Sequence, residues 1–479
     1  MNTQEKKMVY GNLIGGKWLI SNQTYPVYNK HTGDVIADIS IASKEDVHAA
    51  VGNAVETFKT HELSPYNRYE ILLKAAHLIR ERKEELALNI VREGGKVLKD
   101  ARSEVERGIQ TFIASAEEAK RIAGKEIPLQ GQPGNEGKMA FTIRVPVGVV
   151  CAITPFNFPL NLTAHKIAPA LAAGNAVVLK PAAVTPLSAI ALACILQEAG
   201  LPDGFLNIVN GSGAEIGPYL LEDPRISLFT FTGSPEVGAQ IKSKSGIRKV
   251  ILELGNNSPN IVHMDAPDVK KAARLCITKG FINNGQACIS VQRIYVHREV
   301  YKEFVDYAIL AAEQLRKGDP ELEDADIGPM ISVKEAERAE RWILEAVQDG
   351  AQIAVGGTRN GSLLQPTILT EVTSKMKVVC EEVFAPVVSI IAYDDIDEAI
   401  ELANDSRFGL QAGLFTSNIQ LAFKAAKKLE FGGVIINDVS TFRTDIMPYG
   451  GVKDSGFGKE GPAYAVQEMT EERIIVFDL

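Results

Sequence analysis

Cysteine is scarce in this chain of 479 residues, and its five copies, at positions 151, 194, 276, 288 and 380, lie far apart. No two of them form a C-x-x-C pair, so neither a disulfide framework nor a zinc site of the usual spacing is indicated. The seven histidines are isolated too, without an H-E-x-x-H motif. These absences favour a reducing, cytoplasmic location and argue against a metal centre.

Long apolar runs and an excess of positive charge are also missing. No window approaches the ~20 consecutive apolar residues of a membrane helix, and the N-terminus MNTQEKKMVYGNLIGG carries charges where a signal peptide would be apolar. The formal net charge of −9 does not suit nucleic acid, which needs a basic face. We therefore expect a soluble protein with neither a membrane nor a nucleic-acid partner.

The chain does have the composition and rhythm of a multidomain α/β protein. Its 46% hydrophobic and 23% charged residues are close to the globular average, and its length predicts two or three domains of ~150 residues. Residues 43–122 show helical spacing of apolar residues, and from 147 onward Val/Ile/Leu-rich strands alternate with helices in two successive stretches. This pattern predicts an α/β fold with two doubly wound, Rossmann-like parallel sheets.

The segment 125–147 has a different character, because a Gly/Pro/Asn-rich tip lies between arms of alternating polar and apolar residues. It predicts a long β-hairpin that protrudes from a domain. An isolated ribbon is marginally stable, so it needs another domain or subunit as a partner. The final residues TEERIIVFDL predict one more exposed strand.

Two candidate ligand contacts follow strand ends, where doubly wound sheets bind ligands. Gly233-x4-Gly238 opens a helix whose free N–H groups suit a phosphate, although an ordinary strand–helix turn has the same sequence pattern. Lys180 ends an apolar strand, and it either contacts a nucleotide or extends to solvent.

Three further residues are candidates for carbonyl chemistry. Asn157 either supports a local turn or donates its amide to a developing oxyanion. Glu253, at the end of an apolar strand, is either solvated or buried with the raised pKa of a general base. Cys288 is either a small buried filler or a nucleophile. Together with a dinucleotide, these groups could oxidise a carbonyl through a thioester.

Seven motifs resemble the aldehyde dehydrogenase superfamily, in its order and over nearly the whole chain. They are PFNFP (155–159), VVLKPA (177–182), FTGSPEVG (231–238), LELGNNSPN (252–260), NNGQACIS (283–290), EEVFAPV (381–387) and PYGGVKDSGFGKEG (448–461). The resemblance implies NAD(P)-dependent oxidation of an aldehyde to a carboxylic acid. Cys288 would form a thiohemiacetal and then a thioester, Asn157 would hold the oxyanion, and Glu253 would activate the hydrolytic water.

The resemblance also implies NAD or NADP as the cofactor. Its contacts would be Lys180 at the adenosine ribose, Gly233 and Ser234 at the pyrophosphate, Glu382 at the nicotinamide ribose, and Phe384 and Phe156 beside it. Ala183 stands where many NAD-preferring members carry a glutamate. Without that carboxylate a 2′-phosphate meets less repulsion, so NADP is admissible.

The family architecture implies three parts in this chain. Residues 1–124 and 148–253 would form the NAD(P)-binding domain, residues 254–447 the catalytic domain, and residues 125–147 with 466–479 an oligomerisation element. A homodimer or homotetramer would follow.

The substrate is less constrained than the chemistry. Arg443 lies in a loop that borders the substrate funnel in the family, and it forms either a surface or interface salt bridge or an anchor for a substrate carboxylate, phosphate or sulfonate. Aldehydes of the lactaldehyde and succinate semialdehyde types both fit. Two alternatives stay open: a CoA-acylating dehydrogenase, which Glu253 argues against, and a non-catalytic structural protein that retains the fold.

Overall fold

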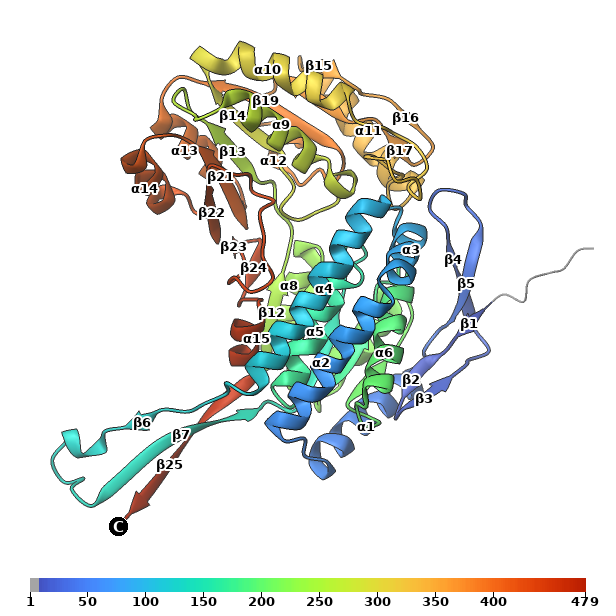
Figure 1. Ribbon diagram of the computed structural model, residues 1–479, viewed down its shortest axis with the longest axis vertical. Coiled ribbons are helices and arrows are strands. Elements are labelled where there is room, and N and C mark those ends of the chain that lie inside the picture. The colour runs from blue at the N-terminus through green and yellow to red at the C-terminus, as the bar shows by residue number, and fades with distance from the viewer. Residues whose placement is uncertain (1–7) are drawn as a thin grey trace, which may run out of the picture.

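The computed structural model describes residues 8–479, which form two α/β bodies and a ribbon that projects from the first of them (Figure 1). The first sheet has eight strands in the order β24-β12-β11-β8-β9-β10-β2-β3, and its five central strands are parallel. The strands of this sheet are β2 (Asn12–Ile14), β3 (Lys17–Leu19), β8 (Val149–Ile153), β9 (Ala176–Lys180), β10 (Leu206–Ile208), β11 (Leu228–Thr232), β12 (Lys249–Glu253) and β24 (Gly456–Phe457).

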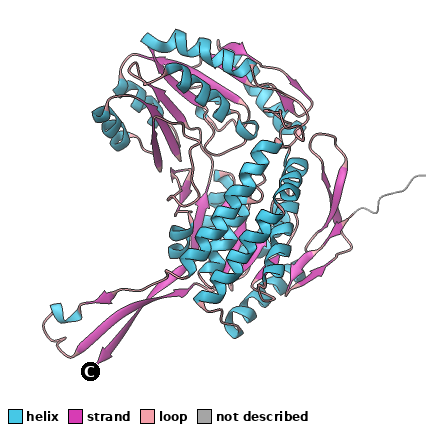
Figure 2. Ribbon diagram, viewed as in Figure 1, coloured by secondary structure: helices cyan, strands magenta, loops and turns pink. Residues whose placement is uncertain are grey.

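Helices surround this sheet, as the alternation of strands and helices predicted (Figure 2). They are α1 (Lys44–Thr60), α2 (Pro65–Glu81), α3 (Lys83–Gly94), α4 (Leu98–Ala119), α5 (Asn161–Ala172), α6 (Leu187–Ala199), α7 (Gly213–Glu222), α8 (Pro235–Lys244) and α15 (Pro462–Glu468). Helix α3 ends where Gly95 takes a left-handed φ of 75°, and the Gly95 N–H donates to the Val91 carbonyl.

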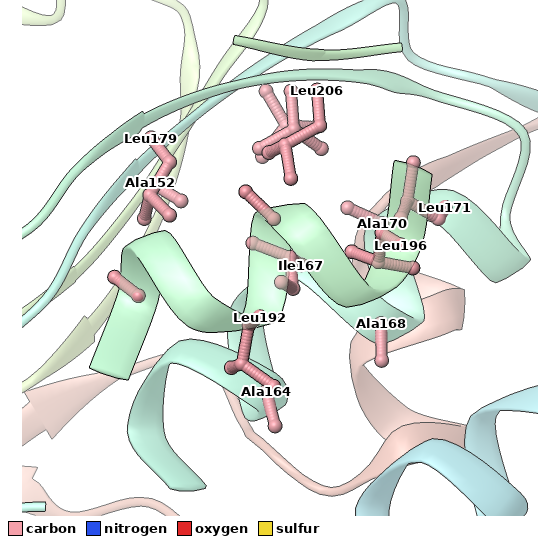
Figure 3. Close-up of a cluster of buried hydrophobic side chains, with 14 of the residues drawn as sticks. Ala152, Ala164, Ile167, Ala168, Ala170, Leu171, Leu179, Leu192, Leu196 and Leu206 are labelled. Carbon is pink, nitrogen blue, oxygen red and sulfur yellow. The ribbon is translucent and has the colours of Figure 1, made fainter. Parts of the chain in front are cut away.

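Helix α5 forms the centre of the first body. It lies between β8 and β9 on one side and the outer helices α2 and α4 on the other. All of its residues are buried, and Ile167 packs among Ala152 and Leu179 of the strands and Leu192 of α6 (Figure 3). The second half of the helix is apolar on every side, as expected of a core helix, whereas its first half also carries buried polar residues. The N-terminus of α5 therefore has a rigid base, and it borders the candidate site described below.

The second body contains a seven-stranded sheet in the order β15-β18-β19-β14-β13-β21-β22. Its strands are β13 (Pro259–Val262), β14 (Arg293–His297), β15 (Gln352–Val355), β18 (Thr367–Thr370), β19 (Val387–Tyr393), β21 (Gln411–Phe415) and β22 (Gly433–Ile436). The helices around it are α9 (Val269–Gly280), α10 (Arg298–Glu313), α11 (Val333–Gln348), α12 (Lys377–Cys380), α13 (Ile396–Asn404) and α14 (Ile419–Lys428). All of its strand pairs except β15–β18 are parallel, so both predicted α/β sheets are present.

The remaining strands are short or peripheral. Strands β1 (Val9–Tyr10), β4 (Thr24–Tyr28) and β5 (Val35–Ser40) form a separate sheet, and two pairs join β16 (Arg359–Asn360) to β17 (Leu363–Leu364) and β20 (Phe408–Gly409) to β23 (Val452–Lys453).

The projecting ribbon is a three-stranded sheet rather than a simple hairpin (Figure 1). Strand β7 (Lys138–Pro146) pairs antiparallel with β25 (Thr470–Asp478) along its full length, whereas β6 (Glu126–Ile127) covers only two residues of it. A single 3-10 turn, η1 (Leu129–Gly131), lies near the tip. The main partner of the ribbon is thus the last strand of the same chain. Within residues 8–479, no helix is long and apolar enough to cross a membrane.

Candidate active site

Two cavities meet at Cys288. The first, of about 320 Å³, lies between the N-terminal half of α4, the start of α5 and the loop 438–449. The second, of about 420 Å³, lies at the carboxyl ends of β8 and β11 and the start of α8. Cys288 lines both. The side chain is therefore not enclosed by hydrocarbon on all sides, and the nucleophile interpretation of this cysteine stays a prediction.

The loop before Cys288 is held in an unusual backbone conformation. In the short helix η2 (Ile282–Gly285), Asn283 and Asn284 have left-handed φ angles of 50° and 57°, which asparagine tolerates better than most residues. The Asn283 Nδ2 donates to the carbonyls of Asn157 and Gln286 at 3.0 and 3.1 Å. A Cβ on Gly285 would lie 2.0 Å from the Ala385 carbonyl oxygen. The loop therefore fastens Cys288 beside Asn157.

The sulfur of Cys288 has one polar partner, the hydroxyl of Tyr449, with Sγ and Oη 3.0 Å apart. Burial raises the pKa of the Cys288 thiol to about 11, while the Tyr449 hydrogen bond and the charge of Arg443 act in the opposite direction. The resting thiol is thus protonated at neutral pH.

Asn157 and Glu253 lie in the buried surroundings of the thiol. Asn157 is 6% exposed, and its Nδ2 donates one hydrogen bond, to the Gln286 carbonyl at 3.0 Å. The second N–H of Nδ2 has no hydrogen-bond acceptor among residues 8–479. Glu253, the last residue of β12, is 2% exposed, and neither carboxyl oxygen has a hydrogen-bond partner. Burial raises the pKa of Glu253 well above its usual value, and Glu460 raises it further. The solvated alternative for Glu253 is therefore wrong.

The second cavity contains five of the six residues expected to contact a cofactor: Phe156, Gly233, Ser234, Glu382 and Phe384. Ser234 caps α8 by accepting from the Val237 N–H. Glu382 Oε1 accepts from the Asn256 N–H at 2.8 Å, and burial raises the pKa of Glu382 to about 7. The rings of Phe156 and Phe384 meet edge to face with centroids 5.9 Å apart.

Lys180 contradicts one of its two interpretations, the one in which it extends to solvent. It is 4% exposed and its Nζ donates to the Pro181 carbonyl at 2.9 Å, so it does not extend to solvent. Burial lowers the pKa of Lys180 to about 8. It does not line the second cavity, whose wall on this stretch is Ala182.

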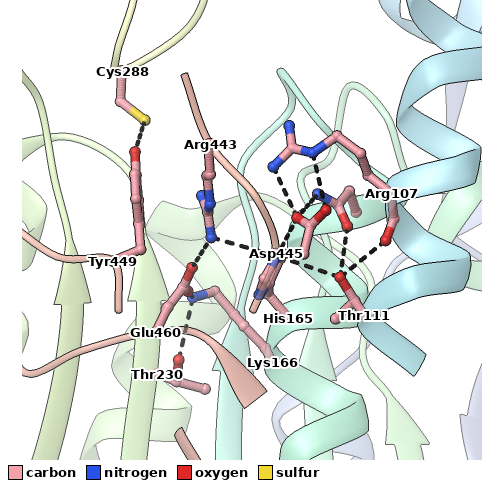
Figure 4. A network of polar contacts seen from close by, with 11 residues as sticks. Arg107, Thr111, His165, Lys166, Thr230, Cys288, Arg443, Asp445, Tyr449 and Glu460 are labelled. Atoms are coloured by element: carbon pink, nitrogen blue, oxygen red, sulfur yellow. Dashed lines mark hydrogen bonds and ion pairs between the residues drawn. The ribbon is translucent and has the colours of Figure 1, made fainter. Parts of the chain in front are cut away.

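A buried polar network forms the wall of the first cavity behind Cys288 (Figure 4). Arg107 of α4 binds both oxygens of Asp445, at 3.2 and 2.8 Å, and His165 of α5 binds Asp445 at 2.8 Å. The Arg443 side chain is 5% exposed, and its Nη2 lies 3.2 Å from Glu460 Oε2. The surface or interface salt bridge considered for Arg443 is therefore wrong, because its ion pair is internal.

This network carries an excess of positive charge. Its cations are Arg107, Lys166 and Arg443, and its carboxylates are Asp445 and Glu460. His165 adds no charge at neutral pH, because burial and the nearby Arg443 lower its pKa. Around the cavity itself the signs balance, because Asp100, Glu104 and Asp438 line it together with Arg107, Lys279 and Arg443. An anionic group could therefore be held here by the local guanidinium groups, and not by an overall positive charge.

Sequence reasoning missed Arg107, His165, Asp445 and the contact of Tyr449 with the sulfur. Arg107 and His165 lie inside helices, where a charged or polar residue signals nothing unusual. Tyr449 stands inside a recognised motif, PYGG, but nothing in that motif shows which way its hydroxyl points. Among residues 8–479, no cluster of three or more His, Cys, Asp or Glu side chains could hold a metal ion.

Comparison with known proteins gives a consistent result. The model of the aldehyde dehydrogenase family matches residues 18–475. The chain is 56% identical over 477 residues to a 3-sulfolactaldehyde dehydrogenase of Priestia aryabhattai, covering 100% of this chain and 99% of that protein.

Two solved structures are similar throughout. Aldehyde dehydrogenase 21 from Physcomitrella patens, in complex with the reaction product succinate, superposes with a TM-score of 0.96 and 39% identity, covering 99% of each chain. Glyceraldehyde-3-phosphate dehydrogenase GapN from Methanocaldococcus jannaschii, complexed with NADP, gives a TM-score of 0.92 and 41% identity, covering 96% of this chain and 100% of that one. The chain therefore belongs to the aldehyde dehydrogenase family, as an NAD(P)-dependent aldehyde dehydrogenase.

Proposed function

We propose that this enzyme oxidises a small anionic aldehyde, foremost a 2-hydroxy aldehyde of the 3-sulfolactaldehyde type, to the free carboxylic acid. The observation that carries the proposal is the first cavity, which is lined by Cys288 and by the guanidinium groups of Arg107 and Arg443. The 3-sulfolactaldehyde dehydrogenase relative and the succinate complex of a structural neighbour support an acid-bearing substrate.

In this proposal Cys288 is the nucleophile. Its thiol first loses its proton to water. The sulfur then forms a C–S bond to the aldehyde carbon, and the carbonyl electron pair moves to oxygen, where the free N–H of the Asn157 amide stabilises it. When bound, NAD(P)⁺ supplies the hydride acceptor. Glu253 then takes a proton from the water that attacks the resulting thioester, and the C–S bond breaks with its electron pair returning to sulfur.

The second cavity fits a dinucleotide at its nicotinamide side. A Cβ on Gly255 would lie 2.8 Å from Glu382 Oε2, and one on Gly233 would lie 2.4 Å from the Phe231 ring, so both glycines keep the cavity wall clear. We infer that Gly233 and Ser234 hold the pyrophosphate, that Glu382 holds the nicotinamide ribose, and that Phe156 and Phe384 pack beside it. For Lys180 to contact the adenosine ribose, its Nζ would have to give up the hydrogen bond to the Pro181 carbonyl and donate to the cofactor instead.

Arg107 is the group best placed to recognise the acid. Its side chain is 27% exposed and lines the first cavity, and its Nε and Nη2 are fixed on Asp445. The third nitrogen, Nη1, makes no hydrogen bond within the described chain. Guanidinium groups bind carboxylates and sulfonates with directional, charge-assisted hydrogen bonds. Arg443 lies deeper in the same wall and adds a second positive charge.

A substrate panel tests this function. The purified enzyme is assayed with 3-sulfolactaldehyde, succinate semialdehyde and lactaldehyde, each with NAD and with NADP, by nicotinamide absorbance. The acid-bearing aldehydes should have kcat/KM at least tenfold above that of lactaldehyde. Equal kcat/KM values for charged and neutral aldehydes would contradict the proposed substrate class. If added CoA replaced water as the acyl acceptor, so that acyl-CoA were the product, the CoA-acylating alternative would be indicated.

The roles of the acid-forming residues are tested separately. A Glu253→Gln variant should release one equivalent of NAD(P)H in a burst and then stall as a thioester, because nothing remains to activate water. A Cys288→Ser variant should give no burst. Unchanged turnover in the first variant would refute the assigned base.

We also infer a homodimer or homotetramer. The three-stranded ribbon leaves Ile474, Val476 and Phe477 53%, 50% and 44% exposed, and apolar side chains on a projecting strand favour a partner.

A further inference from the structure

The hydroxyl of Tyr449 is fixed against the sulfur of Cys288. The side chain is 2% exposed, its ring is covered by the Arg443 guanidinium at 3.5 Å, and its backbone N–H bonds the Glu460 carbonyl at 3.1 Å. Ring and backbone are therefore both held in place. The 3.0 Å contact with Sγ follows from this fixed position.

The direction of this hydrogen bond can be argued from the surroundings. A buried phenol donates its proton to an acceptor whenever one is in reach. No oxygen acceptor lies within hydrogen-bond distance of Tyr449 Oη among residues 8–479, and the adjacent Arg443 offers only donors. The sulfur of Cys288 is the acceptor in reach, so the phenol proton points at Sγ.

We propose that Tyr449 is a positioning residue that donates this hydrogen bond to Cys288 and stabilises the sulfur anion twice in each turnover. The first occasion is the ionised thiol before it attacks the aldehyde. The second is the thiolate that leaves when the thioester C–S bond breaks and its electron pair returns to sulfur. Hydrogen bonds to an ionised acceptor are about twice as strong as neutral ones. The second occasion rests on the function proposed above, whereas the first concerns the thiol alone.

Four groups set the ionisation of this thiol besides burial. Tyr449 and Arg443 favour the anion, whereas Glu382 and Glu253 oppose it. A Tyr449→Phe substitution removes only the hydroxyl, because a phenylalanine ring keeps the face on which the Arg443 guanidinium stacks. The substitution therefore isolates the hydrogen bond from the charge of Arg443.

Alkylation of the full-length protein tests the proposal without any substrate. Iodoacetamide reacts with the thiolate, so its rate at Cys288, followed by mass spectrometry of the modified peptide, reports the ionised fraction at each pH. The Tyr449→Phe variant should be alkylated about tenfold more slowly at neutral pH, with the inflection of the pH profile about one unit higher. Tyr464→Phe, on α15 and outside both cavities, should match the wild type. A Tyr449→Phe profile that superimposes on the wild-type profile would overturn the proposal.

A second variant and a second readout complete the test. Tyr449→Met removes the hydroxyl together with the ring, and it should shift the profile in the same direction; an unshifted profile here would also count against the hydrogen bond. In turnover, Tyr449→Phe should lower kcat while KM for the aldehyde stays within about threefold. If a Cys288→Ser variant retained aldehyde oxidation, the proposed function would be wrong. The alkylation experiment would still test the hydrogen bond between Tyr449 and Cys288, because it uses no substrate.

Discussion

Replacing Arg107 with glutamine should separate charged from neutral substrates. The change removes a guanidinium that lines the first cavity, while Asp445 keeps its bonds to His165 and Asn161 at 2.8 and 3.1 Å. The network on α5 should therefore survive. What disappears is the charge that the proposal assigns to the acid of the substrate.

The size of the effect follows from the exposure of Arg107. A hydrogen bond to a charged group contributes about 1.5–3 kcal/mol. Because the side chain is 27% exposed, solvent screening favours the lower end, about 1.5–2 kcal/mol. At about 1.4 kcal/mol per factor of ten, kcat/KM for 3-sulfolactaldehyde should fall about 10- to 30-fold, mainly through KM.

The assay compares kcat/KM of the variant for 3-sulfolactaldehyde and lactaldehyde at saturating cofactor. Lactaldehyde has no acid group, so its value should change by less than about threefold. Arg121→Gln, which alters an arginine paired only with Glu117 and Glu118 near the other end of α4, should affect neither substrate. Equal losses for both aldehydes would refute the anion-binding role of Arg107.

Three other outcomes are expected. Arg293→Met should lower the free energy of unfolding by about 3 kcal/mol or more in denaturant titrations. The buried guanidinium donates to the carbonyls of Asn257, Leu402 and Ala403, and the substitution leaves these carbonyls unpaired. The control Arg298→Met, at an exposed position, should leave the unfolding transition unchanged. The Kd of the cofactor, measured by fluorescence titration, should fall between pH 6 and 8.5. Glu382 has a pKa of about 7, so it ionises over this range, and the carboxylate accepts ribose hydrogen bonds better than the neutral acid. A pH-independent Kd, or the same pH trend in Glu382→Gln, would contradict the proposed contact between Glu382 and the ribose. Ile474→Glu with Val476→Glu should reduce the mass measured by light scattering after size-exclusion chromatography, whereas Arg473→Gln should not; an unchanged mass would mean that this face of the ribbon is not an interface.

The sequence predicted the residues that follow strands better than those inside helices. Asn157 lies in the loop that follows β8, Gly233 comes directly after β11, and Glu253 ends β12. Parallel strands bring their carboxyl ends to one edge of the sheet. Phe156, Glu382 and Phe384 came with the family motifs, and the second cavity collects them.

The network behind Cys288 could not be foreseen in the same way. Arg107 and Asp445 are 338 positions apart, and they meet only because α4 packs on α5 and the loop 438–449 folds over both. Helical periodicity told us that α4 is amphipathic but not what faces its polar side. The burial of Lys180 could not be foreseen either, since the sequence does not show that β9 lies between β8 and β10 in the middle of the sheet.

The junction of the two cavities at one sulfur has a consequence for inhibitor design. A compound that spans both cavities would pass beside Cys288, because this residue lines both. An electrophile in the middle of such a compound would lie close to the thiol. In the proposed function, the acid end would bind beside Arg107 in the first cavity, and the other end would occupy the second cavity, where the cofactor is proposed to bind. Such a bisubstrate molecule should inactivate the enzyme faster than either half alone.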